Sequence, residues 1–106
     1  MDLRIYGVVL ETVAMLREEM ETIERRDVDL GRQMRRAAAS VALNISEGSG
    51  SSGGVRTQRY RTALGSARET NACLDVAMAL GYVDGVDAAL RGKLDHVIGG
   101  LVRLTV

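Results

Sequence analysis

Apolar residues recur every three or four positions through almost the whole of this 106-residue chain. The pattern is interrupted by short stretches rich in Gly, Ser and Asp, and the sequence contains no Pro. A spacing of three and four places side chains on one face of an α-helix, whereas a half-buried strand alternates every second residue. Phe and Trp are absent and there are three Tyr, a composition that gives little support to a sheet. The sequence therefore predicts an all-α protein.

The pattern divides into four segments, and we expect helices near residues 3–23, 28–48, 55–81 and 86–104. Asp27 or Asp29 can cap the second helix, Asp84 or Asp87 can cap the fourth, and Gly81 can end the third. Helices of about 20 residues with short connections favour an antiparallel up-down-up-down four-helix bundle. A chain of this length has room for one core, so the bundle should be a single domain over residues 1–106.

The stretch SVALNISEGSGSSGG, Ser40 to Gly54, begins as an apolar helix and ends in glycines and serines. We expect residues 49–54 to form a flexible hinge between the second and third helices. The same run lacks the lysine and the preceding strand of a phosphate-binding P-loop, so the linker interpretation is favoured.

Equal distances from the centre of this loop predict which residues of the second and third helices face each other. Glu47 would be stabilised by the N-terminus of the third helix and by Arg56, and Asn44 would need backbone partners around the hairpin. Small residues on both helices would allow a close approach. The pairs expected on this register are Glu47 with Arg56, Asn44 with Arg59 and Tyr60, Ala37 with Ser66, and Glu69 with Arg32 or Arg35.

The same part of the chain resembles a known family. The runs LGRQMRRAAASVALNISEGSG and YRTALGSARETNACLDVAMALGYV contain N-I-x-E-G followed by A-x-G-S-x-x-E, within roughly residues 28–83. They are similar to the four-helix-bundle family named after the proteins encoded in intervening sequences of bacterial 23S rRNA genes. That family also looks related to the accessory variability determinant of diversity-generating retroelements. The motif residues to which we assign a structural role are Asn44, Glu47, Gly48, Gly65, Ser66 and Glu69.

The resemblance implies a four-helix protomer that assembles into a ring-like homopentamer. It also implies that the retroelement relatives bind nucleic acid and a reverse transcriptase. This chain differs from the strongly basic retroelement branch in having no net charge, and Asn71 stands where an apolar residue would be usual.

Charge is distributed unevenly along the chain. By formal count, residues 1–24 carry −4, residues 25–68 carry +6 and residues 69–106 carry −2. The basic block can form a phosphate-binding surface, or its cations can pair with the acidic first and fourth helices. The scarcity of aromatic residues disfavours base stacking, so any contact should be to the backbone of structured RNA or DNA. The candidate phosphate-contacting residues are Arg32, Arg35, Arg36, Arg61 and Arg68.

Catalytic and metal chemistry find little support. His96 and Cys73 are single residues of their type on different predicted helices, interpreted as an exposed or interfacial His and a buried Cys. The serines lack a plausible His–Asp partner pair. Glu47 and Glu69 can be read as an acid–base pair, but interhelical ion pairing is the better interpretation. We expect no catalytic residue, no metal and no cofactor.

Two apolar runs, residues 37–45 and 72–80, are apolar on nearly every helical face, which predicts a homo-oligomer. The lone Cys, the absence of a leader-like start and the lack of an apolar run of about 20 residues predict a cytoplasmic protein without a membrane partner. Two function classes stay open: a nucleic-acid-binding or reverse-transcriptase accessory protein, and a structural or protein-interaction scaffold with no nucleic-acid role. An enzyme is a distant third.

Overall fold

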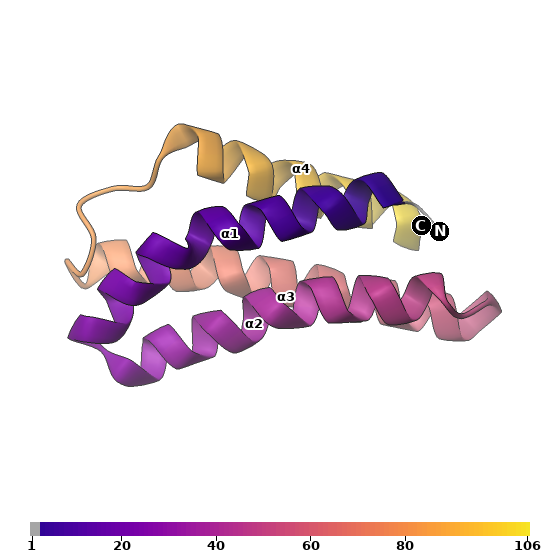
Figure 1. Cartoon of the computed structure of the whole chain (residues 1–106), viewed down its shortest axis with the longest axis horizontal. Coiled ribbons are helices and arrows are strands. Elements are labelled where there is room, and N and C mark those ends of the chain that lie inside the picture. The colour runs from indigo at the N-terminus through magenta and orange to yellow at the C-terminus, as the bar shows by residue number, and fades with distance from the viewer. Residues whose placement is uncertain (1–2) are drawn as a thin grey trace.

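The computed structural model describes residues 3–106, in which the chain forms four helices. These are α1 (Leu3–Arg26), α2 (Val28–Ser49), α3 (Gly53–Ala79) and α4 (Ala88–Thr105). Successive helices run in opposite directions, α4 returns beside α1, and the start of α1 and the end of α4 lie at one end of the bundle (Figure 1). The long dimension of 42 Å is close to the about 40 Å expected for the 27 residues of α3. The predicted antiparallel four-helix bundle is confirmed.

Aspartate side chains cap α2 and α4. The Asp27 carboxylate accepts a hydrogen bond from the Leu30 amide at 3.0 Å, and the Asp87 carboxylate accepts one from the Ala89 amide at 2.9 Å. Each carboxylate satisfies an amide that has no partner within its own helix. The structure therefore selects Asp27 over Asp29 and Asp87 over Asp84.

Gly81 ends α3, as predicted, although the last helical residue is Ala79. Its φ of +76° is a backbone conformation that residues with a Cβ rarely adopt. The Gly81 amide donates to the Met78 carbonyl at 3.0 Å, and the Tyr82 amide donates to the Ala77 carbonyl at 2.9 Å. These two bonds satisfy the last carbonyls of the helix and turn the chain towards α4.

The connection between α2 and α3 is shorter than expected. Helix α2 continues through Ser49 and α3 begins at Gly53, so only residues 50–52 lie outside the helices. The Ser51 hydroxyl and amide donate to the carbonyls of Glu47, at 2.8 Å, and Gly48, at 3.0 Å. Because the loop's own serine closes the end of α2, the predicted hinge over residues 49–54 is wrong for half of its length.

The core runs the length of the bundle in two apolar clusters. The cluster nearer the termini is built on Ile5, Val9, Ile45 and Leu101, and the other on Leu16, Ile23, Met34, Leu74 and Leu90. Thr12 and Thr70 are also buried, and each hydroxyl donates to the carbonyl four residues earlier, at 2.7 and 2.8 Å. As predicted, Cys73 is buried and His96 is exposed. No helix in residues 3–106 is long and apolar enough to cross a membrane.

Asn71 and Met78 of α3 lie towards the edge that faces α4, off the buried face of the helix. Met78 is exposed, while the Asn71 side-chain oxygen accepts a hydrogen bond from Arg91 of α4. The Arg91 guanidinium also donates to Asp75 at 2.7 Å. The buried positions at this end of α3 include Cys73, Leu74 and Ala77, so the buried face has turned away from Asn71 and Met78. Asn71 thus helps to anchor α4.

Candidate nucleic-acid interface

An ion pair near the loop joins α2 to α3. The Glu47 carboxylate lies 3.0 Å from the Arg59 guanidinium, whereas Arg56 donates to the backbone carbonyls of Gly48 and Ser51 at 3.3 and 2.9 Å. The predicted pairing of Glu47 with Arg56 is therefore wrong by about one turn. Helix α3 begins at Gly53, two residues earlier than expected, and a helical residue advances the chain by only about 1.5 Å, so a residue further along the helix lies level with Glu47.

The same shift brings Ser66 opposite Ser40 instead of Ala37. The Ser66 hydroxyl donates to the Ser40 hydroxyl oxygen at 2.8 Å. Asn44 donates to the same oxygen at 3.0 Å and to the Ser40 carbonyl at 2.9 Å. The half-buried Asn44 amide thus finds its partner one turn earlier in its own helix, and not in the backbone around the hairpin. These three residues form a polar link between α2 and α3.

Gly48 allows the ring of Tyr60 to lie against the end of α2. A Cβ at position 48 would be 2.7 Å from the nearest ring carbon, which is closer than real contacts of a Cβ. The Tyr60 ring is buried, and its hydroxyl lies 3.0 Å from the Ser49 hydroxyl. Three residues of the N-I-x-E-G motif, Asn44, Glu47 and Gly48, therefore contribute to the packing of α2 against α3.

Gly65 and Glu69 of the second motif lie on the outer surface of α3. A Cβ at Gly65 would meet nothing within 4 Å. Glu69 is exposed and forms no ion pair with any residue in the part of the chain that the structure describes. The expected pairing of Glu69 with Arg32 or Arg35 is wrong, because Arg35 turns towards α1. The pKa of the nearby Cys73 thiol is raised, mainly by burial and to a smaller extent by the Glu69 charge.

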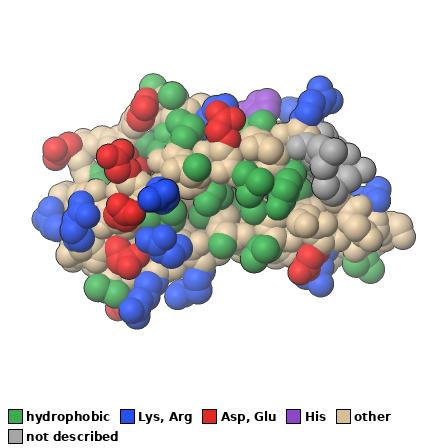
Figure 2. Space-filling model, viewed as in Figure 1, with side chains coloured by type: hydrophobic (Ala, Val, Ile, Leu, Met, Phe, Trp, Pro, Cys, Tyr) green, Lys and Arg blue, Asp and Glu red, His purple; other side chains and the backbone are tan. Residues whose placement is uncertain are grey.

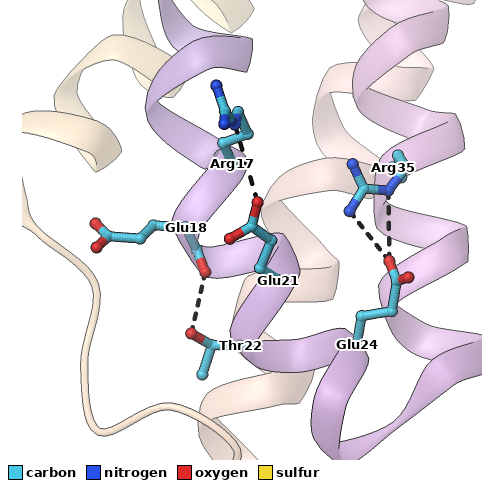
Figure 3. Close-up of polar contacts among 6 residues, drawn as sticks. All are labelled: Arg17, Glu18, Glu21, Thr22, Glu24 and Arg35. Carbon is cyan, nitrogen blue, oxygen red and sulfur yellow. Dashed lines mark hydrogen bonds and ion pairs between the residues drawn. The ribbon is translucent and has the colours of Figure 1, made fainter.

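Arg35 connects α2 to α1. Its Nη2 and Nε donate to one carboxylate oxygen of Glu24 at 3.1 and 3.4 Å (Figure 3). A Cβ at Gly31 would be 2.7 Å from the Glu24 Cα, so a glycine there lets α2 approach the last turns of α1. Beside this contact is a surface hollow of about 410 Å³, which we call the α1–α2 hollow. It is lined by Glu21, Glu24, Arg25, Val28, Arg32 and Arg35.

The five candidate arginines are all exposed, but they do not share one face. Arg32 and Arg35 line the α1–α2 hollow, and Arg36 follows Arg32 by one turn. On α3, Arg59 and Ser66 face α2. Arg61 follows Arg59 by two residues, and Arg68 follows Ser66 by two residues. Two residues correspond to about 200° around a helix, so the pair on α3, Arg61 and Arg68, points away from α2.

Basic side chains gather at the end of the bundle where α1 joins α2, with acidic side chains between them (Figure 2). Besides the residues of α2, this end carries Arg25 and Arg26 in the last turn of α1. The Arg26 guanidinium lies over the Tyr82 ring, 5.6 Å from its centre, while Arg25 donates to the Thr22 hydroxyl at 3.3 Å. Sequence reasoning did not place Arg25 in the site. The adjacent Asp27 cap was the available signal, because it marks a tight turn that brings the end of α1 beside the start of α2.

Tyr82 fastens the α3–α4 connection to this end. Its hydroxyl donates to the Asp27 carboxylate at 3.1 Å. This hydrogen bond raises the pKa of Tyr82, with smaller contributions in the same direction from burial and the Asp27 charge, and the neighbouring Arg26 opposes the rise. Asp27 therefore caps α2 with one carboxylate oxygen and holds Tyr82 with the other.

Within residues 3–106, no three side chains of the types His, Cys, Asp and Glu come close enough to hold a metal ion. At the centre of the bundle, a space of about 10 Å³ is lined entirely by the surrounding core. That volume is at the lower limit for one water molecule. The surface hollows and the arginine-rich end are therefore the features available for recognition.

The model of the family described as 23S rRNA-intervening sequence protein matches residues 1–102. A crystal structure of a protein with unknown function from the S23 ribosomal protein family, from Bacteroides thetaiotaomicron, has a similar fold, with a TM-score of 0.82. The two sequences are 15% identical, and the match covers 95% of this chain and 97% of that one. No curated protein matches the chain. Because the family model spans nearly the whole chain, the protein belongs to the family of 23S rRNA-intervening sequence proteins.

Proposed function

We propose that this protein is a non-enzymatic protein that binds structured nucleic acid through its exposed arginines. The observation that carries the proposal is the small number of ion pairs in the basic block. Of the nine arginines in residues 25–68, only Arg35 and Arg59 pair with a carboxylate among the described residues. Of these two, only Arg35 pairs with an acidic residue of α1, and none pairs with α4. The acidic helices therefore leave most of the basic block uncompensated.

The field near the arginines matters more than the zero net charge of the chain. Charges separated by more than about 8–10 Å are largely screened at physiological salt, so distant acidic residues cancel little of the local field. Arginine is suited to phosphate because its planar guanidinium donates several hydrogen bonds to one oxyanion. Few aromatic side chains are present, which favours contact with the sugar–phosphate backbone of a duplex or hairpin.

The test is fluorescence anisotropy with an RNA hairpin and a DNA duplex, at salt concentrations from low to physiological. Log affinity should fall by about 0.7–0.9 per phosphate contact per log unit of salt. Replacing Arg32, Arg35 and Arg36 with Gln should weaken binding to both ligands and flatten that slope. If the wild type retains neither ligand at low salt, the proposal is refuted.

Two controls keep this test interpretable. Arg35→Gln also removes the contact with Glu24, so helicity and oligomeric state must be measured for the triple variant. The double variant Arg61→Gln/Arg68→Gln removes exposed guanidinium groups that have no ion pair within residues 3–106. It should reduce the salt slope without changing the fold. The resemblance to the retroelement accessory protein adds a reverse transcriptase as a candidate protein partner, which co-purification after co-expression would test.

The second candidate function is an oligomeric scaffold with no nucleic-acid role. It is favoured by exposed apolar side chains: Leu43 of α2 is 63% exposed, Val76 of α3 is 45% exposed, and Leu80, directly after α3, is 56% exposed. An apolar surface of this kind is usual where copies of a chain associate. A homo-oligomer is compatible with both candidates, and the pentamer comes from the family resemblance. Absence of nucleic-acid binding by a stable oligomer would select the scaffold.

A further inference from the structure

The α1–α2 hollow has two cationic groups that no carboxylate neutralises. Its two glutamates already have partners: Glu24 binds Arg35 at 3.1 Å, and Glu21 lies 3.9 Å from Arg17, which is outside the hollow (Figure 3). Arg25 and Arg32 form no ion pair with any residue in the 3–106 range. The lining therefore presents two uncompensated guanidinium groups to one space.

The arginines of the hollow also have free hydrogen-bond donors. A guanidinium carries five N–H donors. Arg35 uses Nε and Nη2 on Glu24, and Arg25 uses Nη2 on the Thr22 hydroxyl. The contact with Glu24 restrains the Arg35 side chain, which lines the hollow and keeps donors that Glu24 does not use. One fixed and two uncompensated guanidinium groups suit an anion that has several acceptor oxygens.

Size and access are also suitable. The hollow is shallow and open to solvent, and its volume of about 410 Å³ leaves room for a phosphate group and the chain attached to it. Val28, also in the lining, is 49% exposed, so part of the wall is apolar and open to solvent. By contrast, Arg61 and Arg68 are two turns apart on α3 and do not line this hollow.

We propose that the α1–α2 hollow is a phosphate-binding site in which Arg25, Arg32 and Arg35 contact one phosphate group. For its natural ligand the inference rests on the proposed function: the phosphate belongs to the bound nucleic acid, as an internal phosphodiester or as a terminal phosphate. The contact gives the protein one phosphate held by three arginines, whereas Arg61 and Arg68 lie outside this hollow.

The first experiment uses inorganic pyrophosphate and the full chain. Arginine Nε–Hε signals are followed by NMR at constant ionic strength, with acetate as the anion control. Pyrophosphate at millimolar concentration should shift Arg25, Arg32 and Arg35 and leave Arg61 and Arg68 unchanged, and acetate should shift none of them. Absent shifts, or equal shifts at all five arginines, would overturn the site.

Substitutions of charged residues give a second readout, because removing arginines and removing a glutamate should change the affinity for pyrophosphate in opposite directions. Arg25→Gln/Arg32→Gln should weaken pyrophosphate binding by about tenfold or more, because it removes two charged hydrogen-bond donors from the site. Arg61→Gln/Arg68→Gln, with the same change of net charge, should leave it within about twofold. Glu21→Gln removes a carboxylate of the hollow and should strengthen binding, whereas Glu69→Gln on α3 should not. Equal effects within either matched pair would contradict the proposal.

The third experiment separates this site from the proposed function. An RNA hairpin is titrated with the wild type and with Arg25→Gln/Arg32→Gln, in one form with a 5′-phosphate and in another with a 5′-hydroxyl. A loss of affinity for both forms identifies an internal phosphodiester, and a loss for the 5′-phosphate form alone identifies a terminal phosphate. RNA binding that the variant leaves unchanged would overturn the hollow as the RNA contact and leave the proposed function standing. Pyrophosphate binding without any RNA binding would refute the proposed function and leave the phosphate site.

Discussion

The hydroxyl oxygens of Ser40 and Ser66 lie 2.8 Å apart where α2 and α3 pack together. Ser66→Ala removes this hydrogen bond but also raises helix propensity, so it is best compared with Ser46→Ala, an exposed serine within α2. We expect Ser66→Ala to have a free energy of unfolding about 0.5–1.5 kcal/mol below that of Ser46→Ala. Urea unfolding followed by circular dichroism measures the difference. Equal stabilities would show that the contact contributes nothing.

Gly48 and Gly65 should respond to alanine in opposite directions. In Gly48→Ala the new Cβ would be 2.7 Å from the Tyr60 ring, and relieving such crowding in a core costs about 1–3 kcal/mol. The gain in helix propensity, at most about 1 kcal/mol, does not offset this cost. In Gly65→Ala the new Cβ meets nothing within 4 Å, so the folded protomer should gain up to about 1 kcal/mol. Thermal unfolding measures both effects. If the melting temperatures of the two variants shifted in the same direction, the packing described for Gly48 and Gly65 would be contradicted.

Much of the fold could be predicted from the sequence. Helix type, helix number and antiparallel order follow from apolar spacing and from short connections, which are local properties of the chain. The cap at Asp27 and the stop at Gly81 were among the predicted signals for the same reason. The edge position of Asn71 was not, because a partner 20 residues away, Arg91, decides it.

The hairpin register could not be predicted from symmetry about the loop. Ser49 and Gly53 belong to the helices and not to the loop, so the chain advances less between them than expected and Arg59, not Arg56, lies beside Glu47. The excess of arginine in residues 25–68 is visible in the sequence, but the sequence does not show which of these arginines lie on the same face of the bundle. Which arginines converge depends on the close approach of α1 and α2 at Gly31, a tertiary contact that charge counting does not reveal.

Tyr82 should make stability depend on pH at the alkaline end. The raised pKa means that the folded protein favours the neutral phenol, so this contribution is complete below the ordinary value of 10.0 and is lost as the pH rises through the folded value. Tyr82→Phe lacks the hydrogen bond to Asp27 and should melt a few degrees below the wild type at neutral pH. The difference in melting temperature should then shrink above about pH 10. A difference that stays constant into that range would show that the Tyr82–Asp27 contact does not set the pKa.

The outer face of α2 and α3 provides the test of self-association. Leu43 is 63% exposed on α2 and Val76 is 45% exposed on α3, and neither is needed to fill the core of one protomer. If this face is buried between copies of the chain, Leu43→Glu and Val76→Glu each place a carboxylate in an apolar interface, where an unpaired charge is strongly unfavourable. Both variants should reduce the molar mass measured by light scattering at micromolar concentration, while circular dichroism shows an intact bundle. Leu10→Glu is the matched control, because Leu10 is 47% exposed on α1, away from this face.

Gly65→Ala tests the same face more finely. If a neighbouring copy packs against Gly65, this variant should weaken the oligomer, so that it dissociates at concentrations at which the wild type stays assembled, even though the protomer itself gains thermal stability. A wild type that is monomeric at micromolar concentration would refute self-association.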